Sequence, residues 1–161
     1  IRLYRRTLAD RELIQGPQHP DTITTRKELA DTYLAGDQIK EAVRLYKRVL
    51  ADREHVLGLD HLDTVAARGG LGSACHAAGR MGFALQLYEQ TCAGYERILG
   101  ADHPNALRYR ARLANAYYKA GRLSDGMALL RDTVARCEQV LPPGDPLLHA
   151  ARESLADMVG G

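Results

Sequence analysis

The sequence has few cysteines, no long apolar run and almost no excess of charge, and each of these shortages narrows what the chain can be. Its 161 residues include three cysteines, an odd number without close pairing, which argues against a disulfide framework or a CxxC metal site. No stretch approaches the roughly 18 apolar residues of a membrane span. We therefore expect a soluble, cytoplasmic protein in which Cys75, Cys92 and Cys137 are small core residues.

The balance of charge and the absence of catalytic motifs exclude further classes of protein. The 22 basic and 20 acidic residues give a formal charge of +2, which is too balanced to argue for nucleic acid or an anionic membrane surface. The sequence contains no HExxH motif, no Gly-rich phosphate loop and no Gly-x-Ser-x-Gly turn. We predict that the chain is not an enzyme and that it takes no metal, cofactor, nucleic acid or membrane as its partner.

The sequence does contain a repeat with a period of 42 residues. The loop histidines His19, His61 and His103 mark three copies, and Pro146 follows Pro104 at the same step in a fourth. The same register relates apolar positions throughout the chain: Leu29, Leu71, Leu113 and Leu155, then Leu45, Leu87 and Leu129. The histidines occur once per repeat, too far apart to bind one ion, so we interpret them as helix caps and loop residues.

Each repeat carries two amphipathic stripes separated by a short turn, which predicts a helix hairpin. Gly36 and Asp37, matched by Gly79 and Gly121, suit the left-handed conformation that ends a helix. Small residues recur where paired helices must approach closely: Ala30, Gly72 and Ala114 on first helices, and Ala42, Ala84 and Gly126 on second helices.

The period predicts an all-α fold, a right-handed α-solenoid of stacked antiparallel helix hairpins with a concave and a convex face. We expect one domain over residues 1–161, with a leading helix at about 3–14, full hairpins at 21–56, 63–98 and 105–140, and a final helix at 146–159. Because the pattern is already under way at Ile1, which is not a methionine, we expect the chain to be a piece of a longer protein.

The repeated motifs resemble those of a known family. A Gly-x-x-His-Pro-Asp-Thr loop, a Leu-Ala pair followed by Tyr, and the Glu-Ala-Val-Arg-Leu-Tyr segment at 41–46 are similar to kinesin-light-chain-type tetratricopeptide repeats. The Ala-Asp-Arg-Glu segment at 51–54 resembles the bacterial subgroup, whose repeats often follow a signalling ATPase module. The resemblance implies a scaffold within a larger bacterial signalling or regulatory protein, whose concave groove binds extended or helical peptide segments.

Two readings of a repeated arginine remain open. Arg26, Arg68, Arg110 and Arg152 recur at the 42-residue step on the first helices. Their guanidinium groups favour carboxylates, so they either form a basic track for an acidic peptide or pair with an acidic residue or loop carbonyl of a neighbouring repeat. We include Arg68 and Arg110 among the candidate binding residues.

The remaining candidates lie at positions of the first helices that should face the groove: Thr24, Lys27, Asp31, Leu34, Arg108, Arg112 and Asn115. Lys27, Arg108 and Arg112 resemble part of the carboxylate clamp of chaperone-binding tetratricopeptide domains, although Asp31 and Gly70 replace two of its polar members. These residues predict either such a clamp or a general preference for an acidic partner. Gly69, Gly70 and Gly72 either open a depression in the groove or reflect decay of the repeat.

Two alternatives to groove binding follow from the same pattern. The chain could be a self-association module whose ends pair through Leu3, Tyr4, Leu8, Leu147, Leu148 and Leu155. It could also be an autoinhibitory or sensing segment of the longer protein. The sequence does not decide between these roles, because fold does not imply function.

Overall fold

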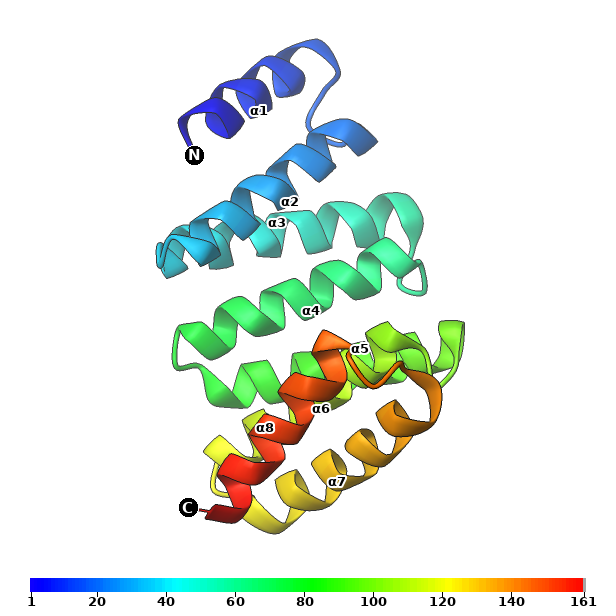
Figure 1. The fold of residues 1–161 in the computed structure, drawn as a ribbon. Coiled ribbons are helices and arrows are strands. Elements are labelled where there is room, and N and C mark those ends of the chain that lie inside the picture. The colour runs from blue at the N-terminus through cyan, green and yellow to red at the C-terminus, as the bar shows by residue number, and fades with distance from the viewer. Residues whose placement is uncertain (161) are drawn as a thin grey trace. The chain divides into compact units, whose positions relative to one another are not determined.

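The fold consists of α-helices joined by short loops. The computed structural model describes residues 1–160, and in that range it contains eight helices (Figure 1). Their bounds are α1 (Arg2–Ile14), α2 (Pro20–Ala35), α3 (Ile39–Leu57), α4 (Leu62–Ala77), α5 (Met81–Leu99), α6 (Pro104–Lys119), α7 (Leu123–Val140) and α8 (Pro146–Gly160). Consecutive helices pack as antiparallel pairs, which confirms the predicted fold class of helix hairpins.

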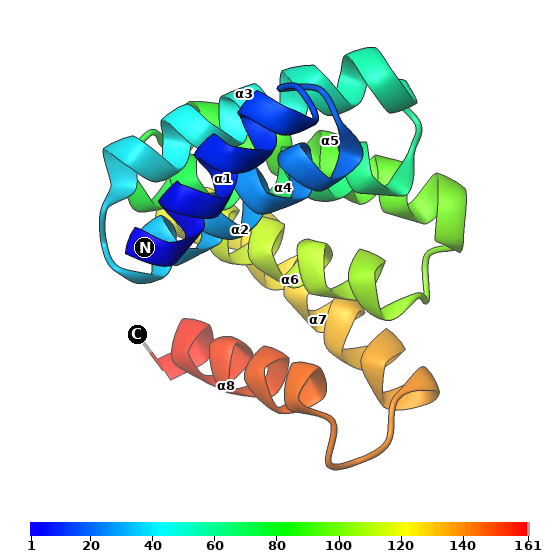
Figure 2. The ribbon, with the colours of Figure 1, turned by 90° about the horizontal axis from the view of Figure 1, so that it is seen from above.

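The chain forms two compact units, residues 1–84 and residues 85–161. In the first, α2 packs on α3, α3 on α4, and α1 covers α2 (Figure 2). In the second, α6 packs on α7, and α8 contacts both of them. Each unit is therefore built from neighbouring helices that bury one face against the next helix in the chain.

The apolar stripes of the repeats form the cores of both units. In the first unit Ile23, Val49 and Ala67 pack together, with the partly buried Leu50 beside them. In the second unit the core contains residues of three helices: Leu107, Ala111, Ala114, Leu130, Val134, Cys137, Leu148, Ala151 and Met158. The predicted positions Leu29, Ala30 and Tyr33 are also buried. Burial thus follows the 42-residue register read from the sequence.

The small residues allow close approach of paired helices. Ala30 and Ala42 of the first unit and Ala114 of the second are fully buried. At Gly126, a Cβ atom would lie 2.7 Å from the backbone oxygen of Ala114 and 2.9 Å from the backbone nitrogen of Tyr118. The α6–α7 contact therefore admits no side chain at Gly126.

A side-chain cap begins four of the helices. Nδ1 of His19, His61 and His103 accepts a hydrogen bond from the backbone nitrogen two residues later, at 3.3, 3.1 and 3.1 Å. Oδ1 of Asp145 accepts one from the nitrogen of Leu147 at 2.8 Å. Each bond satisfies one of the amide groups that a helix start leaves without a partner.

The hairpin turns adopt the left-handed conformation at one position of the repeat. Asp37 (φ 57°) takes it in the first hairpin, at the step occupied by Gly79 (φ 70°) and Gly121 (φ 83°). Gly36, which precedes Asp37, has a φ of −90°. An aspartate can replace glycine here because its short polar side chain tolerates this region.

Candidate functional site

The recurring arginines each pair with a glutamate of the preceding helix. The distances are 2.7 Å for Arg26–Glu12, 3.2 Å for Arg68–Glu54, 2.8 Å for Arg110–Glu96 and 2.6 Å for Arg152–Glu138. The glutamates recur at the same 42-residue step as the arginines. Each guanidinium group thus ties a first helix to the helix before it, and this pairing favours the structural reading over a basic track.

Burial of these arginines differs along the chain. The Arg26 side chain is 1% exposed and also bonds Asp52 at 2.5 Å and the carbonyl of Pro17 at 3.1 Å. Arg110 bonds Asp132 in addition to its glutamate, whereas the Arg152 side chain is 54% exposed. The candidates Arg68 and Arg110 are 12% and 17% exposed, so little of either guanidinium group is accessible to a ligand.

On α2, the four candidate residues follow each other at helical spacing and share one face. Thr24 is exposed, and Lys27, Asp31 and Leu34 are half-buried. The ammonium group of Lys27 lies 2.7 Å from a carboxylate oxygen of Asp31, whose other oxygen accepts a hydrogen bond from the Tyr46 hydroxyl. This face therefore presents a paired charge beside a polar and an apolar side chain.

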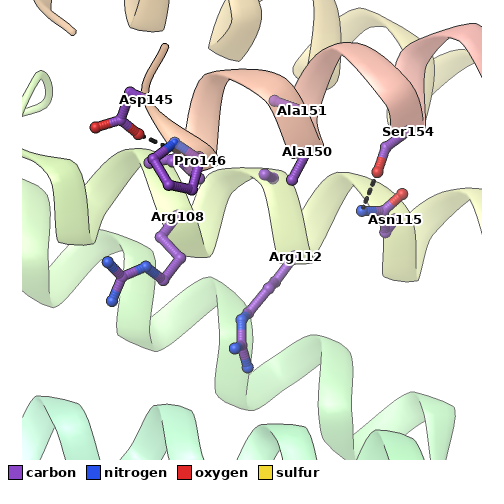
Figure 3. A pocket seen from close by; sticks show the side chains of 10 residues that line it. Arg108, Arg112, Asn115, Asp145, Pro146, Ala150, Ala151 and Ser154 are labelled. Carbon is purple, nitrogen blue, oxygen red and sulfur yellow. Dashed lines mark hydrogen bonds between the residues drawn. The ribbon is translucent and has the colours of Figure 1, made fainter. Parts of the chain in front are cut away.

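Three of the candidates meet in one groove of the second unit. Arg108, Arg112 and Asn115 of α6, together with residues at the start and middle of α8, line a cavity of about 470 Å³. Both arginines are exposed. Figure 3 shows their guanidinium groups reaching away from α8, while the amide of Asn115 turns toward Ser154 and donates to its hydroxyl at 3.4 Å.

Small side chains make much of the rest of the groove. Ala111 of α6 lines it, as do Ala150 and Ala151 of α8, and Leu147 is the one larger apolar residue in the lining. Asp145 and Pro146 lie at one end (Figure 3). The Asp145 carboxylate caps α8, so one of its oxygens is already occupied. The groove accordingly has two cationic groups on one side and a smooth, mostly apolar surface on the other.

Aromatic residues support the arginine side of the groove. The guanidinium carbon of Arg112 lies 5.4 Å from the ring centre of Tyr109, within the range of a cation–π interaction. Tyr109 in turn stacks on Tyr95 at 5.5 Å and meets Tyr88 at 6.2 Å. Burial raises the pKa of Tyr109 to about 12, so its hydroxyl stays neutral near neutral pH and adds no competing charge.

Sequence reasoning missed the α8 side of the groove. Ser154 and Ala150 occupy the repeat positions of Arg112 and Arg108, and the 42-residue register could have indicated that they face the same way. It also left the glycines of α4 undecided. A Cβ atom at Gly70 would overlap the ring of Tyr46, so that space is filled by the chain's own side chain.

The apolar residues predicted at the two ends of the chain differ in exposure. Leu148 is 2% and Leu8 8% exposed, whereas Leu3 is 76% and Tyr4 37% exposed. Among the described residues no cluster of three or more metal-binding side chains occurs. Nor is any helix in residues 1–160 long and apolar enough to cross a membrane.

Antiparallel helix hairpins at a 42-residue step, capped alike and tied by a repeated Arg–Glu pair, define a helical repeat protein. Two sequence models, both described as Tetratricopeptide repeat, match the chain, one over residues 1–55 and 37–97 and the other over 107–147. The chain belongs to the tetratricopeptide repeat family. Such repeats are generally protein-interaction modules and typically non-catalytic.

Solved structures agree with this assignment. The chain is 29% identical to the kinesin light chain nearly identical TPR-like repeats of Podosopora anserina, with a TM-score of 0.84 over 99% of this chain and 75% of that one. A glutamine-to-methionine variant of those repeats gives 29% identity, the same coverage and a TM-score of 0.85. These similarities confirm the kinesin-light-chain-type resemblance.

A third structure shares the fold. BtubC (BKLC) from P. vanneervenii is 18% identical, with a TM-score of 0.84 over 98% of this chain and 63% of that one. No curated protein sequence matches the chain.

Proposed function

We propose that the chain is a scaffold that binds an acidic peptide segment in the groove between α6 and α8. The observation that carries this proposal is the presence of two exposed guanidinium groups, Arg108 and Arg112, along one open groove whose lining also includes three alanines and a serine. The paired N–H donors of a guanidinium group match the two oxygens of a carboxylate, and small lining side chains leave room for a peptide backbone. The cavity of about 470 Å³ lies within the usual range of ligand sites.

The roles of the lining residues follow from their chemistry. Arg108 and Arg112 attract and orient the carboxylates of the peptide. The amide of Asn115 is held by a long bond of 3.4 Å to Ser154, so it can exchange that partner for a backbone carbonyl of the ligand. The apolar surfaces of Ala111, Ala150 and Ala151 contribute through burial when the peptide is bound.

The α2 face of the first unit is a separate proposed binding surface. Thr24, Lys27, Asp31 and Leu34 offer polar, ionic and apolar contacts to a peptide, and the Lys27–Asp31 pair is open to exchange because both side chains are more than a third exposed. The other two candidates, Arg68 and Arg110, already pair with Glu54 and Glu96, so they contact a ligand only where its carboxylate displaces those glutamates. We place the module in the cytoplasm, within a larger bacterial signalling or regulatory protein.

Binding to an array of acidic peptides, followed by fluorescence anisotropy with the tightest binder, tests the groove. Arg108→Ala/Arg112→Ala should raise Kd at least 10-fold and flatten its dependence on salt, because two charges are lost. Lys119→Ala/Arg131→Ala removes two exposed cations outside the groove and is the matched control. Equal weakening by both variants would show bulk attraction instead of a site.

Self-association remains a second candidate because of one observation on α1. Leu3 and Tyr4 are 76% and 37% exposed, whereas Leu45 and Tyr46 at the same repeat positions are 5% and 3% exposed. A helix from a second copy could cover this face as a neighbouring helix covers it in the other repeat.

Light scattering across a dilution series tests that reading. Self-association predicts a mass that rises with concentration and returns to the monomer value with Leu3→Asp. Leu13→Asp, at an 87% exposed position of the same helix, should leave the mass unchanged. A monomer at every concentration rejects self-association and leaves groove binding untouched.

A further inference from the structure

A second charged pocket lies in the first unit, between α1, α2 and α3. Its volume is about 230 Å³. Arg5 of α1 and Arg44 and Arg48 of α3 line it, together with an apolar set of side chains that includes Leu8, Tyr33 and Leu45. Arginines therefore surround an apolar floor in this pocket.

The charges of the pocket do not balance. Arg26 also lines it, but Glu12 and Asp52 neutralise that buried guanidinium from two sides. Arg48 lies 3.9 Å from Asp52, at the limit of an ion pair, and its side chain is 56% exposed.

Neither Arg5 nor Arg44 has a hydrogen-bond or ion-pair partner for its guanidinium in residues 1–160. Four arginines against the two carboxylates Glu12 and Asp52 leave a formal charge of +2. Like charges gathered over an apolar floor repel each other, and an anion that enters between them relieves that repulsion.

The repeat itself shows that these arginines are not required for packing. At the positions of Arg5, Arg44 and Arg48, the next copy has Lys47, Gln86 and Gln90, and the one after it has Glu89, Ala128 and Asp132. In that last copy the charges are engaged within the chain, because Glu89 accepts from the Tyr117 hydroxyl and Asp132 pairs with Arg110 and Arg136. Helices can thus pack with neutral or acidic residues here.

We propose that this pocket binds an acidic peptide segment that carries an apolar side chain next to its carboxylates. The carboxylates bond the forks of Arg5, Arg44 and Arg48, and the apolar side chain covers the floor formed by Leu8, Tyr33 and Leu45. Charge complementarity selects an anion, and the apolar floor selects a peptide with a hydrophobic residue over a bare inorganic ion. This site is separate from the α6–α8 groove and does not depend on it.

The test uses the full chain with Arg108→Ala and Arg112→Ala already in place, so that the other groove does not bind the probe. The probe is a fluorescein-labelled peptide of sequence Glu-Glu-Leu-Glu-Glu-Leu, and its comparison peptide has glutamine at every glutamate. The pocket variant adds Arg5→Glu, Arg44→Gln and Arg48→Gln, residue types that the other copies carry at these positions.

The control variant instead adds Arg2→Glu, Arg6→Gln and Lys40→Gln, which change the net charge equally at exposed positions outside the pocket. Circular dichroism and thermal unfolding check that all proteins are folded alike.

We expect the pocket variant to raise Kd for the acidic probe at least 10-fold and the control variant to change it less than 3-fold. The glutamine peptide should bind at least 10-fold more weakly than the acidic one. Equal losses in the two variants, unchanged binding in the pocket variant, or no binding of the acidic probe at millimolar concentration would each overturn the proposal. Binding of phosphatidylserine vesicles without binding of the peptide would overturn it in favour of a membrane surface.

Discussion

At the scale of the residue, one repeat position shows how burial changes the contribution of an ion pair to the free energy of unfolding. Arg26 and Arg152 each bond a glutamate of the preceding helix, yet their side chains are 1% and 54% exposed. We expect Arg26→Ala to destabilise the chain by at most about 3–5 kcal/mol, since it removes the buried guanidinium group but leaves Glu12 and Asp52 partly solvated. Arg152→Ala should cost about 1 kcal/mol or less.

Urea unfolding followed by circular dichroism measures both variants. A cost for Arg26→Ala that matches the cost for Arg152→Ala would contradict the structural role assigned to the buried pair. Arg26→Met separates charge from packing, because it keeps most of the length of the side chain but removes the guanidinium group that Glu12 and Asp52 share.

The capping histidines give a second prediction at this scale. His103→Ala removes the acceptor for the Asn105 backbone nitrogen and should cost about 1 kcal/mol. His103→Asp should be close to neutral, because Asp145 already caps α8 in the same way at the fourth copy. His149→Ala, on an exposed surface, is the control and should change the free energy of unfolding by less than about 0.5 kcal/mol in the same assay.

At the scale of the element, Gly126 sets the distance between α6 and α7. Gly126→Ala places a methyl group against the backbone of Ala114 and Tyr118 and should destabilise by about 1–3 kcal/mol, despite the better helix propensity of alanine. Gly82→Ala on α5 meets nothing within 4 Å and should instead stabilise by up to about 1 kcal/mol. The two substitutions should shift the midpoint of thermal unfolding in opposite directions. A gain of stability in both variants would show that the α6–α7 contact can accommodate a methyl group at position 126.

The helices could be predicted from the sequence because each copy repeats the same buried positions and the same cap and turn residues. One face of a helix was evident from Leu29, Ala30 and Tyr33, and the loop histidine marked the start of that helix. The sequence did not show which residue takes the left-handed turn conformation in the first hairpin, because Gly36 and Asp37 are both suited to it. The role of Gly70 could not be predicted, because it depends on the path of the Tyr46 ring from another helix.

At the scale of the whole molecule, the candidate site was only half predictable. Arg108, Arg112 and Asn115 follow helical spacing on one segment, so their common face was visible in the sequence. Ser154 and Ala150 reach the same groove through packing of α8 on α6, a contact between segments about 40 residues apart. The Arg5–Arg44–Arg48 pocket was missed for the same reason. Its arginines lie on α1 and α3, and α2 separates these helices in the sequence.

Stability at high pH provides a prediction for the whole folded chain. Burial raises the pKa of the Cys92 thiol from its ordinary value of 9.0 to about 12, and that of Tyr109 from 10.0 to about 12. Between pH 9 and 12 the unfolded chain therefore releases protons that the folded chain retains. Because the unfolded state then binds fewer protons, the free energy of unfolding falls as pH rises through this window, and the stabilisation is fully present below pH 9.

The Cys92 contribution can be isolated by substitution. Cys92→Val installs the residue that Val134 provides at the same repeat position, and should reduce the fall in unfolding free energy by about 1.4 kcal/mol per pH unit between pH 9.5 and 11.5. Urea unfolding at half-unit pH steps measures the slope, with both proteins compared at pH 7 to remove any constant difference in packing. Identical slopes in the wild type and the variant would mean that the thiol ionises equally in the folded and unfolded chains, and would contradict its burial between the helices of the second unit.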